Sequence, residues 1–164
     1  MNIKIQQMTL DDIEQVIAID QASFSLPWPV KSFRFEVTDN PASRAWVAES
    51  DGKIISMIVA WMFVDEVHIA TIATHPDFRR QGIASRLLIH TLQSVMSEGA
   101  KSSFLEVRAG NTAAQEMYRK LGFEESGRRP RYYKNNDEDA ILMTLSSFQG
   151  YKETRDSAQV DEAG

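Results

Sequence analysis

The sequence predicts an α/β fold built on a mixed (α+β) sheet, and three observations lead to this prediction. Short stretches rich in strand-forming residues occupy much of residues 45–74 and return after each later helical segment. Apolar residues recur at helical spacing between residues 83 and 96 and between 113 and 121. The 164 residues are 43% hydrophobic and 25% charged, which is the size and composition of one globular domain. We expect one domain over residues 1–147, in the order β-α-α-β-β-β-α-β-α-β-β, and a polar, disordered tail over 148–164.

Local signals set the expected boundaries. Thr9 followed by Asp12 resembles a capping box before the first helix, and Pro27 ends that helix. Asp51-Gly52 is a strong hairpin signal, and Gly122 stands where a left-handed helix cap belongs. The expected strands are at 3–5, 45–49, 54–64, 66–74, 104–107, 123–128 and 140–145, and the expected helices at about 13–22, 30–37, 83–99 and 112–121.

Composition excludes several kinds of protein. Eighteen basic and twenty-three acidic residues give a net charge of −5, whereas nucleic-acid binders usually carry a basic surplus. The absence of cysteine excludes disulfides, thiolate metal sites and a thiol nucleophile. No apolar run approaches the roughly 20 residues that span a bilayer, and the first residues lack a secretion signal. We therefore expect a cytoplasmic protein, monomeric or weakly dimeric, with no nucleic-acid or membrane partner.

The three histidines suggest no metal site. His68, His75 and His90 lack metal-ligand spacing, and we assign them no chemistry. We expect His75 in a turn and His90 on an exposed helix face.

The segment HPDFRRQGIASRLL is a candidate anion site. It leads from a strand into an apolar helix, whose first backbone N–H groups lack helical partners and carry partial positive charge. Gly82 has no side chain to keep a pyrophosphate from those donors, and Arg79, Arg80 and Arg86 add charge. An ordinary strand-to-helix turn with solvated arginines would show the same pattern. The segment lacks the lysine of a P-loop and the Gly-x-Gly-x-x-Gly of a dinucleotide fold.

The segment LEVRAGNTAAQEMYRKLGF contains a candidate acid–base pair. Glu106 interrupts a strand otherwise suited to burial, where a carboxylate is costly unless it is paired or useful. Tyr118 lies on the following helix and could share a cleft with it. The alternatives are a surface ladder of Glu106 with Arg108, and a core tyrosine whose hydroxyl is hydrogen-bonded.

These segments resemble the GNAT N-acetyltransferases. RRQGIA matches their acetyl-CoA pyrophosphate motif (Arg/Gln-x-x-Gly-x-Gly/Ala), although Ala84 stands where many relatives have glycine. TIATHPDFRRQGIASRLL and LEVRAGNTAAQEMYRKLGF resemble the family over longer blocks. FSLPWP and RRPRYYKNNDEDAILM are similar to the RimI branch, which acetylates the N-terminal alanine of a small-subunit ribosomal protein. The resemblance covers residues 1 to about 147.

The resemblance implies a GNAT acyl-CoA N-acyltransferase fold, acetyl-CoA as co-substrate, no metal, and direct transfer to a protein N-terminus. It gives Glu106 the role of general base and Tyr118 that of general acid. The residues it implies for cofactor binding are Ile72, Ala73, Thr74, Arg79, Arg80, Gln81, Gly82, Ile83, Ala84, Ser85 and Asn111.

Acceptor choice in this fold would rest on the loop around Trp28 and the hairpin around Tyr132 and Tyr133, although Trp28 could equally fill the edge of the core. Two other functions remain open. One is an acetyltransferase for a lysine side chain, polyamine or other small amine, and the other is a non-catalytic acyl-CoA-binding module.

Overall fold

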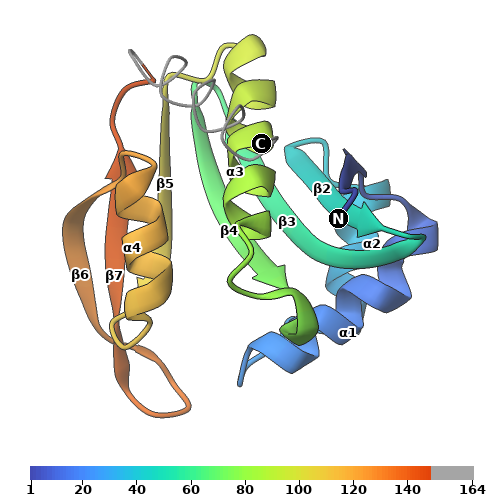
Figure 1. Cartoon of the computed structure of the whole chain (residues 1–164). Coiled ribbons are helices and arrows are strands. Elements are labelled where there is room, and N and C mark those ends of the chain that lie inside the picture. Colours follow the sequence, from blue (N-terminus) through green and yellow to red (C-terminus); the bar gives the residue numbers. More distant parts are fainter. Residues whose placement is uncertain (149–164) are drawn as a thin grey trace. The chain divides into compact units, whose positions relative to one another are not determined.

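The computed structural model describes residues 1–148, which Figure 1 shows as ribbons. These residues fall into two compact units. The first comprises Met1–Trp61 and Ala70–Ser94, and the second comprises Met62–Ile69 and the described residues from Val95 onward. Residues 149–164, most of the expected tail, lie outside the described residues. Phe148, which we assigned to that tail, is buried with 7% of its surface exposed.

The expected mixed sheet and element order are confirmed. The strands are β1 (Lys4–Gln7), β2 (Ser43–Ser50), β3 (Lys53–Phe63), β4 (Glu66–Thr74), β5 (Ser102–Arg108), β6 (Glu124–Tyr133) and β7 (Glu138–Leu145). The helices are α1 (Ile13–Ser23), α2 (Val30–Thr38), α3 (Ile83–Ser97) and α4 (Thr112–Lys120). Two short 3-10 helices, η1 (Leu10–Asp12) and η2 (Pro76–Phe78), precede α1 and α3.

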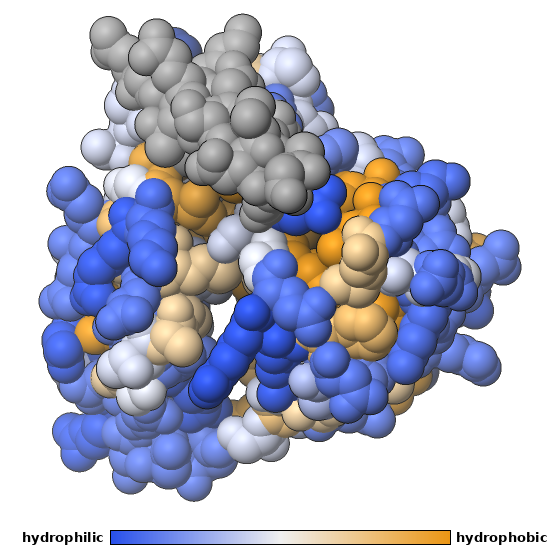
Figure 2. All heavy atoms as spheres, in the orientation of Figure 1, coloured by the Kyte–Doolittle hydropathy of each residue, from blue (hydrophilic) through white to orange (hydrophobic). Residues whose placement is uncertain are grey.

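In the first unit, helices cover both faces of the strands. β1, β2 and β3 pair antiparallel, and the strand order is β1-β2-β3-β4. On one face, Val16 of α1 and Phe33 of α2 pack in one cluster with Val47 of β2. On the other face, the next residue of β2, Ala48, packs with Ile83 of α3. This alternation follows from the two-residue period of a strand. In Figure 2, apolar surface shows over the first unit among hydrophilic side chains.

Local signals for turns and caps in this unit are confirmed. The backbone N–H of Thr9 donates to Asp12 Oδ2 at 2.8 Å, which fixes the start of η1 before α1. Asp51 and Gly52 both have positive φ, 51° and 79°, as a two-residue hairpin turn requires.

The second unit contains the order β4-β5-β7-β6. The first three residues of β4, Glu66 to His68, pair parallel with Ser102 to Phe104 of β5. β5 pairs antiparallel with β7, and β7 pairs antiparallel with β6.

β6 is longer than predicted. We expected it to end at Arg128, but it runs to Tyr133 and so includes Pro130, which cannot donate a ladder hydrogen bond. β6 is the edge strand, and its register with β7 shifts between Arg129 and Tyr133, where Arg131 has a φ of 50°. An edge strand with a bulge accommodates a proline, which is why the strand continues.

The caps of α4 are as expected. Asn111 Oδ1 accepts a hydrogen bond from Ala114 N at 3.2 Å, and Gly122 has a φ of 99° just beyond the helix.

Candidate active site

The candidate anion site is an exposed turn of the first unit between β4 and α3. Arg80 and Gly82 have positive φ, 63° and 76°, and the side chains of Arg80 and Gln81 are exposed. Arg86 N donates to Gly82 O at 3.1 Å, which is the first hydrogen bond of α3. The N–H groups of residues 83–85 precede this bond and so have no acceptor within the helix. The turn therefore offers backbone donors at the positive end of a 15-residue helix.

Arg79 ties this turn to other elements of the first unit. Its Nε donates to Thr74 O at 3.0 Å, and its Nη2 donates to Ser23 Oγ at 3.0 Å. Of the residues implied for cofactor binding, Arg79 is thus already engaged with protein atoms. Ile83 is buried in the core, while Ala84 and Ser85 are half-buried.

The end of β4 is fixed by Ser56 of β3. Ser56 Oγ donates to Ala73 O at 2.9 Å and lies 3.0 Å from Thr74 Oγ1. Ala73 and Thr74 are buried, and Ile72 is half-buried. The three residues of β4 implied for cofactor binding therefore lie on a strand end held by side-chain hydrogen bonds.

In the second unit, Glu106 is held by His68. Glu106 Oε1 lies 2.8 Å from His68 Nε2, and the His68 ring stacks on Phe104 with centroids 4.6 Å apart and planes 5° from parallel. Arg129 Nε lies 4.0 Å from Glu106 Oε2. The hydrogen bond with His68 lowers the pKa of Glu106 below its ordinary value, although burial opposes this. Glu106 is therefore ionised at neutral pH.

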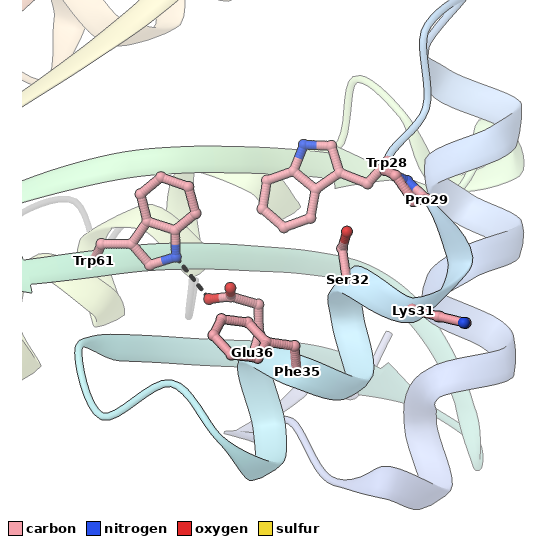
Figure 3. A pocket seen from close by; sticks show the side chains of 7 residues that line it. All are labelled: Trp28, Pro29, Lys31, Ser32, Phe35, Glu36 and Trp61. Atoms are coloured by element: carbon pink, nitrogen blue, oxygen red, sulfur yellow. Dashed lines mark hydrogen bonds between the residues drawn. The ribbon is translucent and has the colours of Figure 1, made fainter.

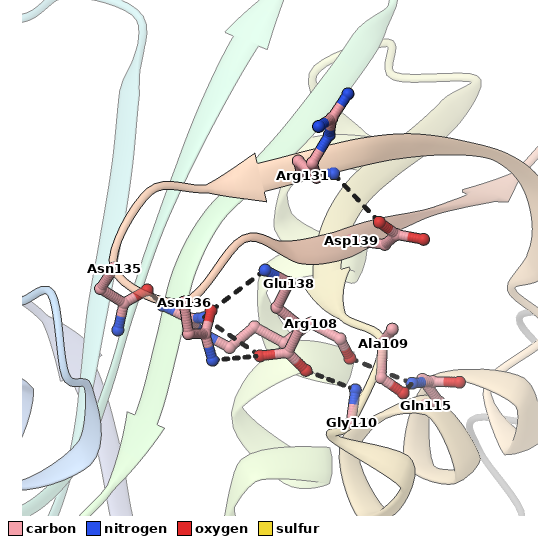
Figure 4. Close-up of polar contacts among 9 residues, drawn as sticks. All are labelled: Arg108, Ala109, Gly110, Gln115, Arg131, Asn135, Asn136, Glu138 and Asp139. Carbon is pink, nitrogen blue, oxygen red and sulfur yellow. Dashed lines mark hydrogen bonds and ion pairs between the residues drawn. The ribbon is translucent and has the colours of Figure 1, made fainter.

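Arg108 does not pair with Glu106, so the surface-ladder alternative is wrong. Arg108 Nη1 lies 3.1 Å from Glu138 Oε1, as Figure 4 shows. Glu138 Oε2 accepts from Gly110 N at 2.7 Å, and this hydrogen bond is the main reason that the pKa of Glu138 is lowered. This network anchors the loop that precedes α4.

The β6–β7 hairpin is held in the same region. Asp139 Oδ1 accepts from Arg131 N at 3.0 Å. The Arg108 guanidinium lies 3.9 Å from the centroid of the Tyr133 ring, and Tyr132 meets Tyr133 edge-on at 5.1 Å. Tyr133 is thus a fixed part of this unit, whereas Tyr132 is 46% exposed.

Tyr118 is a core residue of the second unit. It is 6% exposed and meets Phe123 edge-on at 5.9 Å. Burial raises the pKa of Tyr118 far above its ordinary value, so that the phenol stays protonated. Among residues 1–148, its hydroxyl has no side-chain or backbone hydrogen-bond partner.

Comparison with known proteins identifies the family. The model of the acetyltransferase (GNAT) family matches residues 13–123. The chain belongs to the GNAT acetyltransferase family. It is therefore an N-acetyltransferase, and the expected GNAT fold and family resemblance are confirmed.

Two relatives and one further structure show the extent of this similarity. A Bacillus subtilis protein, provisionally named a ribosomal protein bS18-alanine N-acetyltransferase, is 34% identical over 87% of this chain and 94% of its own. The crystal structure of the ribosomal-protein-S18-alanine N-acetyltransferase from Escherichia coli has 31% identity and a TM-score of 0.81, over 88% of this chain and 93% of that one. Arabidopsis thaliana NAA60 in complex with acetyl-CoA shares the fold, with a TM-score of 0.79 over 87% of this chain and 97% of that one, at 19% identity.

The GNAT site residues divide between the two units. The residues implied for the cofactor, apart from Asn111, belong to the first unit, as does Trp28. Glu106, Asn111, Tyr118, Tyr132 and Tyr133 belong to the second. Trp28 packs against the core of its unit, because its ring stacks on buried Phe33 with centroids 5.0 Å apart.

Sequence reasoning missed His68. Only the strand register reveals its role, because His68 pairs with Phe104 and residues 104 and 106 share a face of β5. His75 is in a turn as expected, where its Nδ1 accepts from Asp77 N at 3.1 Å. His90 was placed wrongly on an exposed face: it is half-buried, with its ring 4.5 Å from that of Trp46, and burial lowers its pKa.

Two further observations concern residues 1–148. No helix there is both long and apolar enough to cross a membrane. No three acidic or histidine side chains of that part of the chain are placed to hold a metal ion together.

Proposed function

We propose that this GNAT protein transfers the acetyl group of acetyl-CoA directly to the N-terminal α-amino group of a protein, such as the N-terminal alanine of a small-subunit ribosomal protein. The observation that carries this proposal is the match of nearly the whole chain to the Escherichia coli S18-alanine N-acetyltransferase. The ionised Glu106 and the protonated Tyr118 support it, because they are a base and an acid in the states that the reaction needs.

Acetyl-CoA would be held mainly by backbone. The N–H groups of residues 82–85 would bind the pyrophosphate, with charge from Arg80. The end of β4, Ile72 to Thr74, would pair with the pantetheine arm. The Asn111 side chain, which caps α4, would also contact the cofactor.

The chemical step needs a neutral amine. A peptide α-amino group has a pKa near 8, so roughly a tenth is neutral at pH 7. A lysine side chain has a pKa near 10.4, about 2.4 units higher, so forming its neutral amine costs roughly 3.3 kcal/mol more. Glu106 would take the proton of the ammonium, directly or through a water. The amine nitrogen then attacks the thioester carbon, the carbon–sulfur bond breaks, and Tyr118 gives its proton to the leaving thiolate. The nitrogen loses its second proton to water as the amide forms, and the tyrosinate takes a proton back from water.

The proposal also covers the domain organisation, location and partners of the protein. We infer one folded domain over residues 1–147, acting in the cytoplasm as a monomer or weak homodimer, without nucleic-acid or membrane partners. The net charge of −5 supports the absence of nucleic-acid and membrane partners, because a negatively charged protein repels a polyanion.

An amine panel tests the proposed acceptor. The purified chain is incubated with acetyl-CoA and either Ala-initiated peptides, the same peptides with a blocked N-terminus, free lysine side chains, or a polyamine, and thiol release is followed. We expect kcat/KM for the free Ala-initiated peptides to exceed that for every other acceptor at least about 10-fold. Equal rates with a polyamine would make the chain a small-amine acetyltransferase. Tight acetyl-CoA binding without thiol release for any amine would make it a binding module.

A further inference from the structure

The first unit contains an aromatic pocket that the proposed chemistry does not use. It has a volume of about 470 Å³ and lies between the start of α2 and the end of β3. Trp28 and Trp61 form its walls, with ring centroids 6.1 Å apart and planes 20° from parallel, and Phe35 lies beside them (Figure 3). The volume falls within the range of roughly 300–1,000 Å³ typical of small-ligand sites.

A carboxylate lies among these aromatic rings. Glu36 is 6% exposed, and its Oε1 accepts a hydrogen bond from Trp61 Nε1 at 2.6 Å. Its other hydrogen bonds come from the Asn40 amide, at 3.2 and 3.3 Å. Both donors are neutral, and within residues 1–148 Glu36 has no ion pair. The buried charge is therefore oriented by the protein but is not neutralised by it.

Lys31, the one cation among residues 1–148 that lines the pocket, does not supply this charge. Lys31 is exposed, and Figure 3 shows its ammonium pointing away from Glu36 and Trp61. Indole and phenyl faces attract a cation, and a buried carboxylate favours the same ligand charge. An apolar occupant would leave the carboxylate desolvated, and an acidic one would be repelled by it.

Exposed apolar side chains adjoin the pocket along the chain. Phe24, Leu26, Val30 and Phe35 are between 37% and 58% exposed, and all lie on the segment from the end of α1 through α2. Large exposed apolar side chains gathered on one segment are typical of a surface that contacts another polypeptide. A polypeptide ligand is thus favoured over a free small cation.

We propose that the pocket formed by Trp28, Trp61, Phe35 and Glu36 binds a basic side chain, arginine or lysine, of the acceptor polypeptide. This inference rests on the proposed function for the identity of the ligand as an acceptor. The aromatic rings hold the aliphatic stem and the flat face of the cation, and Glu36 accepts hydrogen bonds from its N–H groups. The pocket thereby selects among N-termini by a residue beyond the acetylated one.

Matched peptides test this inference. Ala-initiated hexapeptides carry one arginine at position 2, 3, 4, 5 or 6 among neutral residues, and each is paired with a peptide that has the isosteric neutral citrulline at that position. We expect kcat/KM for the arginine peptide to exceed that for its citrulline pair about 10-fold at one or two positions. The preference should fall below about 2-fold in Glu36→Gln, which keeps an acceptor for Trp61 and Asn40.

Two controls separate this effect from general changes. Asp39→Asn removes an exposed charge just beyond α2 and should leave the arginine preference unchanged. Phe35→Leu should weaken the preference, whereas Phe63→Leu should not, although the two phenylalanines are similarly exposed at 50% and 53%. Circular dichroism of each variant checks that the fold is kept.

The outcomes distinguish this inference from the proposed function. Equal rates for arginine and citrulline peptides at all positions, or a preference that survives Glu36→Gln, would overturn it while acetylation of both peptides leaves the proposed function in place. If no peptide is acetylated, quenching of tryptophan fluorescence by the peptides still tests whether the pocket binds arginine. Stronger quenching by arginine than by citrulline peptides, lost in Glu36→Gln, supports the pocket, and equal quenching overturns it.

Discussion

The Nε2 atom of His68 lies 2.8 Å from Oε1 of Glu106, and this contact sets the protonation of the carboxylate proposed as the general base. The imidazole is itself fixed by stacking on Phe104, whose ring is 5° from parallel to it. Arg129 Nε lies 4.0 Å from the second oxygen, Oε2. His68 thus occupies one oxygen of Glu106 and leaves the other for a proton.

Replacing His68 should shift the pH dependence of the reaction. The hydrogen bond holds the pKa of Glu106 below its ordinary value, so Glu106 stays ionised well into the acid range. His68→Leu removes the donor, so the pKa of Glu106 rises and the acid limb of kcat/KM moves to higher pH. His68→Gln can still donate and should restore part of the difference. Profiles between pH 5 and 9 check this, with His75→Gln as the control in a turn. An acid limb that stays in place in His68→Leu would exclude this role.

The same contact predicts a stability change on acidification. A carboxyl whose folded pKa is depressed contributes stability that is fully present above its unfolded pKa and is lost as pH falls through the folded pKa. Wild type should therefore lose more of its unfolding free energy than Glu106→Gln as pH falls below about 4.3, the ordinary pKa of glutamate. Urea unfolding at pH 7 and at lower pH measures the difference. Parallel pH dependences in the two proteins would contradict the assignment.

Glu106→Gln and Tyr118→Phe should slow the chemical step without weakening the cofactor complex. General acid or base catalysis contributes about 10²–10⁴-fold, so we expect kcat to fall at least about 100-fold in either variant. The dissociation constant of acetyl-CoA, measured by calorimetry, should stay within about 2-fold. An equal loss of affinity and turnover would count against the base assignment, and an unchanged kcat in Tyr118→Phe would point to another acid.

Gly82→Ala should weaken acetyl-CoA binding. The φ of 76° at Gly82 lies in the left-handed region, where a side chain costs roughly 1–2 kcal/mol, and the new methyl would stand among the proposed diphosphate donors. We expect the dissociation constant to rise at least about 10-fold. Gly52→Ala, at a φ of 79° in the β2–β3 hairpin, is the matched control, because it carries similar strain and should leave affinity unchanged. If both variants lose affinity equally, the turn has no special part in binding.

Asp20→Asn should change the pH dependence of stability in the opposite sense to Glu106. Asp20 is 1% exposed, its Oδ2 accepts from Trp28 N at 2.8 Å, and its buried Oδ1 has no partner in the described structure. Burial raises its pKa, so wild-type stability falls as pH rises from the unfolded pKa of about 3.9 through the higher folded value.

The asparagine variant lacks this loss. Relative to wild type, its unfolding free energy should increase between pH 4 and pH 7, as measured by thermal unfolding. Asp39→Asn, at an exposed position, should show no such gain. A constant difference between Asp20→Asn and wild type at all pH values would contradict the prediction.

Features set by neighbouring residues could be predicted from the sequence, whereas features set by distant ones could not. The Asn111 cap, the Asp51-Gly52 turn and the left-handed Gly122 depend on a few consecutive residues, and all three were predicted correctly. The extension of β6 past Pro130 depends on its place at the sheet edge, which no local signal gives. Within the candidate site, the sequence pointed to Gly82 and Glu106 but not to His68. That residue is 38 positions from Glu106 and meets it only through the β4–β5 register.

Arg79 illustrates what such long-range contacts imply for the working protein. Its guanidinium joins the last residue of β4 to Ser23, the last residue of α1, while its backbone begins the turn proposed for the diphosphate. A movement of this turn on cofactor binding would therefore be transmitted through Arg79 to the chain just ahead of Trp28. Through its two hydrogen bonds, Arg79 thus ties the turn proposed for the diphosphate to the segment just ahead of Trp28, so a substitution of this one side chain loosens both.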